Sequence, residues 1–178
     1  MKKLILVSFV MLMLPVLGHA QLGTTTVTNQ VSVTVSAEAA LTIGASATTL
    51  TSTGTNFSNY TGTTPFTYFI RTTKSGGSGF IKLQVTTDFA PAGGPSVATP
   101  PTAGDTLSYT CTVSSPGTAC SGSQTSSTAS QTSVATFGAD AHSAKAGNSA
   151  SVLWDLSNDP LYQTGTFTAV VTYTISAS

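Results

Sequence analysis

The fold is decided by residues 27–43, VTNQVSVTVSAEAALTI, in which apolar and polar side chains alternate. Every odd position except Asn29 is apolar, and nearly every even position is polar. This period of two is typical of a β-strand with one buried face. One straight strand of this length would extend about 55 Å, whereas a domain of this size is only about 40 Å across. We therefore expect the segment to break near Ala37–Ala40, to change sheets, or to extend beyond its own domain.

The same alternation continues along the chain, and no helical stripe appears after the N-terminal apolar run. Trp154 shares its parity with Val152 and Leu156, which predicts a core position and not an exposed platform for a ligand. The glycine-rich residues 76–79 predict a hairpin between the first two of the later strands. About seven short strands predict an all-β fold, a single Ig-like or Greek-key β-sandwich. The later strands are expected at 66–72, 80–87, 107–113, 134–137, 152–156 and 166–176.

The N-terminus has the features of a removable export signal. Lys2 and Lys3 precede an apolar run over 4–17, and small residues follow, which predicts cleavage between Ala20 and Gln21. The run is shorter than the roughly 20 residues that a membrane-spanning helix needs. We therefore expect a signal peptide over 1–20 and one domain over 21–178. The mature chain is then secreted or held at a bacterial cell surface after passing through the periplasm, and it has no membrane span.

Charge is scarce, since only 7% of residues are Asp, Glu, Lys or Arg, against roughly 25% in ordinary soluble domains. Two of the six basic residues lie in the signal, so the mature chain has 6 − 2 = 4 basic residues against six acidic ones, a net charge of −2. This balance gives no reason to expect nucleic acid as a partner. Low charge also weakens the repulsion between copies, which favours self-association.

Cys111 and Cys120 are the two cysteines of the chain. In an exported protein, two cysteines this close in sequence predict a disulfide. We expect it to staple a hairpin whose turn is 115–118. A Cys-x-x-Cys spacing, typical of redox proteins, is missing.

Residues for catalysis are few, because the mature sequence has one histidine, His142, and one glutamate, Glu38. Asp140 with His142 supplies two metal ligands and no third. Asp155 and Asp159 flank a turn, where turn and cap roles are expected. The sequence lacks a Gly-x-Ser-x-Gly motif for a nucleophile. We therefore expect no enzyme, no cofactor and no metal site.

Two stretches, 31–41 and 165–175, resemble the opening and closing strands of bacterial surface-fibre subunits, especially fimbrial subunits of the alternate chaperone–usher class and spore-coat-U-like secreted proteins. Cell-wall-associated WxL-type domains end in a similar strand. The fimbrial resemblance implies that residues 21–36 are an extension that fills a neighbouring subunit by β-strand addition. It also implies self-association or other surface subunits as partners, with a periplasmic chaperone. The implied donor side chains are Val27, Val31, Val33 and Val35; alternatively, these residues form an ordinary first strand of a closed sandwich.

The leading interpretation is thus an exported, non-catalytic structural subunit. A second interpretation is a secreted carbohydrate- or protein-binding module that uses the loops around Tyr60, 91–105 and 121–133. Long loops in compact domains are often functional.

Overall fold

The computed structural model describes residues 25–52 and 54–178. The predicted signal and its cleavage site at Ala20 and Gln21 lie outside these residues. The chain divides into two units, one that ends at Thr34 and one that runs from Val35 to Ser178. Residues 25–34 carry no strand, and every strand of the described residues lies in the second unit.

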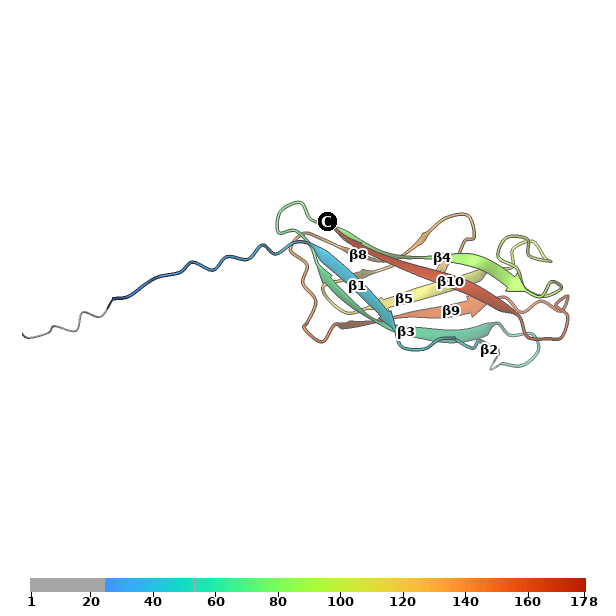
Figure 1. Cartoon of the computed structure of the whole chain (residues 1–178). Coiled ribbons are helices and arrows are strands. Elements are labelled where there is room, and N and C mark those ends of the chain that lie inside the picture. Colours follow the sequence, from blue (N-terminus) through green and yellow to red (C-terminus); the bar gives the residue numbers. More distant parts are fainter. Residues whose placement is uncertain (1–24, 53) are drawn as a thin grey trace, which may run out of the picture. The chain divides into compact units, whose positions relative to one another are not determined.

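The described residues form two antiparallel sheets and no helix, which confirms the all-β sandwich (Figure 1). They contain ten strands and not the expected seven, because three two-residue strands lie beside seven longer ones. The first sheet, sheet A, has the order β1-β3-β9-β5-β7, with β2 also paired to β3; its strands are β1 (Glu38–Ile43), β2 (Thr51–Ser52), β3 (Tyr60–Arg71), β9 (Asn148–Leu156), β5 (Leu107–Val113) and β7 (Gln124–Thr125). Sheet B has the order β10-β4-β8-β6, with strands β10 (Thr168–Ala177), β4 (Gly79–Ala90), β8 (Thr132–Phe137) and β6 (Thr118–Ala119).

The core lies between the central strands of the two sheets, and alternation decides which side chains enter it. Tyr68 on β3 and Val152 on β9 are fully buried from one sheet, and Leu83 on β4 is fully buried from the other. Trp154 is 4% exposed, so its predicted core position is confirmed. The same parity rule places neighbouring threonines and serines on the outer faces of the sheets.

The predicted hairpin at 76–79 is wrong. The strands on either side of it, β3 and β4, belong to different sheets, so residues 72–78 cross from sheet A to sheet B. Sequence alternation specifies which face of a strand is buried, but it does not specify the neighbouring strand.

Several predicted boundaries also differ from the structure; β9, for example, begins at Asn148, four residues before its expected start. Strand β3 begins at Tyr60, six residues before its predicted start. The prediction missed these residues because Gly62 and Pro65 interrupt the apolar alternation. The predicted loop 121–133 contains β7 and the beginning of β8 at Thr132. Strand β1 begins at Glu38, inside the expected break of the first alternating segment.

The disulfide between Cys111 and Cys120 is present, with a Cα–Cα distance of 5.6 Å. It does not staple a hairpin within one sheet, which corrects the sequence prediction. Cys111 lies on β5 of sheet A, whereas Cys120 follows β6 of sheet B and donates its backbone N–H to Val134 O at 2.9 Å. The bond therefore joins the two sheets covalently along one side of the sandwich.

Replacing both cysteines by alanine should lower the free energy of unfolding by roughly 2.5–3 kcal/mol, because the open chain regains the entropy of a loop of about ten residues. Urea unfolding followed by tryptophan fluorescence measures the change. The wild-type protein under reducing conditions is the matched control and should show the same loss. A loss below about 1 kcal/mol in both samples would mean that this link between the sheets adds little stability.

Candidate functional site

The edge strands differ between the two long sides of the sandwich. On one side, the sheets end in the two-residue strands β6 and β7, and the disulfide joins β5 to the residue after β6. Very short edge strands are a common protection against pairing with other chains. On the other side, the sheets end in the longer strands β1 and β10, which contact each other (Figure 1).

Strand β10 is a ten-residue edge whose register shifts are confined to its first residues. Among the described residues, a single strand, β4, pairs with it, so its outer edge presents free backbone N–H and C=O groups. Its sequence, TAVVTYTISA, has no charged residue and no proline. Register shifts lie between Thr168 and Val171, and the pairing is regular from Val171 to Ala177. A long, uncharged, regular edge favours pairing with another strand.

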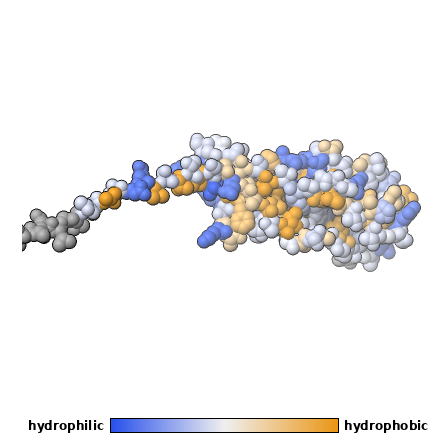
Figure 2. Space-filling view, viewed as in Figure 1, coloured by the Kyte–Doolittle hydropathy of each residue, from blue (hydrophilic) through white to orange (hydrophobic). Residues whose placement is uncertain are grey.

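The inward side chains at this side are only partly covered. Five of them define what we call the open side; they are Leu41 and Ile43 of β1 and Val171, Tyr173 and Ile175 of β10. All five pack against the core but are only half-buried, whereas the corresponding side chains of the central strands are fully buried. Figure 2 shows apolar side chains gathered over β1 and the adjoining part of β10. Further apolar contacts along this side would therefore remove hydrocarbon from water.

The side chain of Tyr173 extends from the open side into the core. Its ring lies 5.7 Å from that of Phe66, between centroids, and its hydroxyl is buried without a hydrogen-bond partner among the described residues. Burial raises the pKa of this hydroxyl to about 12, and the nearby Thr64 hydroxyl offsets only part of the effect. The inner part of the open side is thus dry, although its rim is exposed.

The predicted donor side chains lie in both units. Val35 opens the second unit and is 62% exposed; Val27, Val31 and Val33 belong to residues 25–34, and they are also exposed. Residues 25–36, TTVTNQVSVTVS, have no charge, no proline and no glycine. Their composition therefore matches that of β10, and both are typical of strands.

His142 and the acidic residues considered as candidate site residues make contacts within the domain. His142 Nε2 lies 3.7 Å from Asp140 Oδ1, and both side chains are more than half exposed. Asp155 accepts a hydrogen bond from Asn59 Nδ2 at 2.6 Å. Asp159 accepts hydrogen bonds from the Thr102 hydroxyl and the Leu161 amide, which hold the pKa of its carboxyl below the usual range. The contacts of Asp159 order its loop, as turn and cap residues do. Asp155 instead lies within β9, so the turn role predicted for it is wrong.

One shallow depression, of about 290 Å³, lies on the outer face of sheet A. Its polar lining comes from Asp155 and from serines and threonines, and the half-exposed Leu153 supplies an apolar part. Ser123 in this lining belongs to the loop region 121–133 that the sequence proposed for binding; Tyr60 lies in β3, and 91–105 connects β4 to β5.

Over residues 25–52 and 54–178, no group of three or more His, Cys, Asp or Glu side chains is placed to hold a metal ion. Within the same ranges, no helix has the length and apolar character required to cross a membrane. Comparisons with protein-family models, curated proteins and solved structures give no match to this chain.

Proposed function

We propose that this protein is an exported, non-catalytic structural subunit that assembles with further copies of itself by β-strand addition. Residues 27–35 of one copy add a strand along β10 of the next, with their valines directed toward the open side. Backbone hydrogen bonds supply much of the contact, and the alternating valines supply its register.

The observation that carries the proposal is the long, uncharged β10 edge. It combines free backbone groups, an absence of charge over ten residues and half-buried inward side chains. A monomer that functioned alone would gain from a charge, a proline or a covering loop at this edge, since such features prevent unwanted pairing. The opposite side of the same sandwich has short edges and a covalent bond.

The donor segment matches this edge in length and pattern. Residues 27–35 extend about 30 Å as a strand, which is close to the length of β10. Each valine moved from water to an apolar contact contributes roughly 1.5–3 kcal/mol. Four such side chains offset much of the cost of ordering the segment, which is about 1–2 kcal/mol per residue, and the backbone hydrogen bonds to β10 offset the rest.

The disulfide is compatible with an extracellular or periplasmic protein, because such bonds persist in oxidising compartments. Export and signal cleavage are part of the proposal, as is a periplasmic chaperone that covers the apolar edge before assembly. The chain would then act at the cell surface or in the medium.

The proposal is tested with the mature protein beginning at Gln21, compared with a truncated form that lacks the residues up to Val35. The full mature chain should form filaments or a ladder of oligomers in electron microscopy and size-exclusion chromatography, and the truncated form should stay monomeric. Circular dichroism of both forms shows whether the sandwich is retained. Intact protein that never polymerises at high concentration would refute the proposal.

A second candidate function is a secreted module that binds carbohydrate or protein, favoured by the hydroxyl-lined depression on sheet A. Asp155 in its lining, which accepts a hydrogen bond from Asn59 Nδ2, carries a carboxylate that can also accept from sugar hydroxyls. Glycan-array binding by a monomer, lost when Asp155 is replaced by alanine, would support this function over assembly.

A further inference from the structure

We infer that Glu38 prevents residues 27–35 from folding back along β1 over the open side of their own molecule, so that the segment is available only to another copy. This inference rests on the proposed function. It concerns the few residues that precede β1, where the chain would have to reverse its direction for the segment to return to its own domain.

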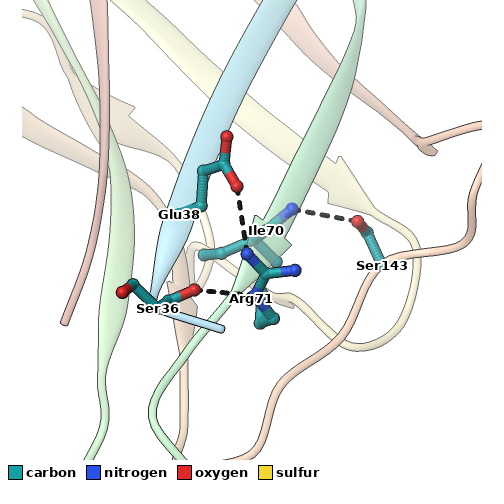
Figure 3. Close-up of polar contacts among 5 residues, drawn as sticks. All are labelled: Ser36, Glu38, Ile70, Arg71 and Ser143. Atoms are coloured by element: carbon teal, nitrogen blue, oxygen red, sulfur yellow. Dashed lines mark hydrogen bonds and ion pairs between the residues drawn. The ribbon is translucent and has the colours of Figure 1, made fainter. Parts of the chain in front are cut away.

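Arg71 holds the start of β1 by two contacts (Figure 3). Its Nη2 lies 3.0 Å from Glu38 Oε2, and its Nε donates to Ser36 O at 2.7 Å. Glu38 is also the β1 residue that pairs directly with Arg71 in the sheet. The chain is therefore fixed on both sides of Ala37.

The end of β3 is itself anchored, so Arg71 cannot easily follow a movement of β1. The Ile70 N–H donates to Ser143 Oγ at 2.9 Å (Figure 3). In return, the Ser143 N–H donates to Ile70 O at 2.9 Å. Arg71 forms a further antiparallel bridge with His142.

A two-residue reversal at Ser36 and Ala37 would place the valines on the wrong face. It would pair Val35 with Glu38 and Val33 with Ala40, and directly opposed residues of an antiparallel pair point to the same face. Glu38 and Ala40 are exposed on the outer face of sheet A. Such turns also need a positive φ, and among the described non-glycine residues the positive φ values occur at Asn56, Phe57 and Asp140.

A three-residue reversal over 36–38 would give the correct face. It would pair Val35 with Ala39 and Val33 with Leu41, both of which point toward the core. This loop requires its third residue in the left-handed region, and that residue is Glu38. A glutamate is disfavoured there, and the reversal would also break both contacts of Arg71. Glu38 is thus a positioning residue that selects donation to another copy over self-insertion.

The test replaces Glu38 by glycine in the full mature chain, which permits the left-handed conformation. The Glu38→Gly protein should shift roughly tenfold from polymer toward monomer, with residues 27–35 protected from hydrogen exchange in that monomer. Glu38→Ala is the matched control, because it removes the same ion pair without that backbone freedom. It should shift the ratio by less than about threefold.

Hydrogen exchange separates the inference from the proposed function. If the Glu38→Gly monomer leaves 27–35 unprotected, or if the wild-type monomer already protects them, the inference is overturned, whether or not polymers form. Wild-type protein that forms no polymer overturns the proposed function instead. Equal polymer yields for the glycine and alanine variants would also count against the role of Glu38.

Discussion

Replacing Val33 by aspartate should abolish assembly of the mature protein and leave its sandwich folded. Val33 is 84% exposed in the described chain, so the substitution removes no core contact. In the assembled state, however, the carboxylate would be buried against apolar side chains of the next copy. The lost valine contact and the burial of an unpaired charge together cost several kcal/mol, which lowers the association constant by at least about 100-fold. Sedimentation velocity at increasing concentration measures it.

The neighbouring substitution Thr34→Asp is the matched control for this prediction. It introduces the same charge one residue away, on the face that points outward from the sandwich when Val33 points inward. The Thr34→Asp protein should therefore assemble nearly as the wild type does. Equal inhibition by both substitutions would show that overall charge, and not strand parity, controls association. Assembly of the Val33→Asp protein at wild-type concentrations would contradict a donor role for this segment.

Much of the fold was predictable from sequence because a strand with one buried face alternates apolar and polar side chains. Val152, Trp154 and Leu156 share one parity and all three are buried from β9. The alternation does not indicate which of the two sheets a strand joins, since the same pattern suits either sheet. The hairpin expected between β3 and β4, and the one expected around the disulfide, failed for this reason.

Of the proposed assembly site, only one partner was visible in the sequence. The proposed donor valines stand out because they continue the alternation of β1 beyond the length of a domain. The proposed accepting edge does not, because a strand can be identified as an edge only when the order of the sheet is known. One signal was available in retrospect, namely the absence of charge and proline across residues 168–177. The contact between Arg71 and Ser36 joins residues far apart in the sequence and had no local signal.

Replacing Trp154 by alanine should cost about 3–5 kcal/mol of unfolding free energy, because a large cavity would open in the middle of sheet A. The Trp154 ring lies 5.4 Å from that of Tyr109, between centroids, and its Nε1 donates to Thr64 Oγ1 at 2.9 Å. Its loss therefore removes apolar contacts and an aromatic pair and also leaves the buried Thr64 hydroxyl with one partner fewer. Urea unfolding followed by far-ultraviolet circular dichroism measures the change, since the variant lacks the tryptophan signal.

Leu153→Ala is the matched control, one residue away and of opposite parity. Leu153 is 48% exposed on the outer face of sheet A, so its truncation should cost less than about 1 kcal/mol. The two substitutions also separate the proposed functions. Both residues line the depression on that face, but only Leu153 exposes its side chain there, whereas the indole of Trp154 is directed into the core. A ligand at the depression would respond to Leu153→Ala with little change in stability. Trp154→Ala would weaken such binding, or assembly, only as far as it unfolds the sandwich, and similar stabilities for the two variants would contradict a core role for Trp154.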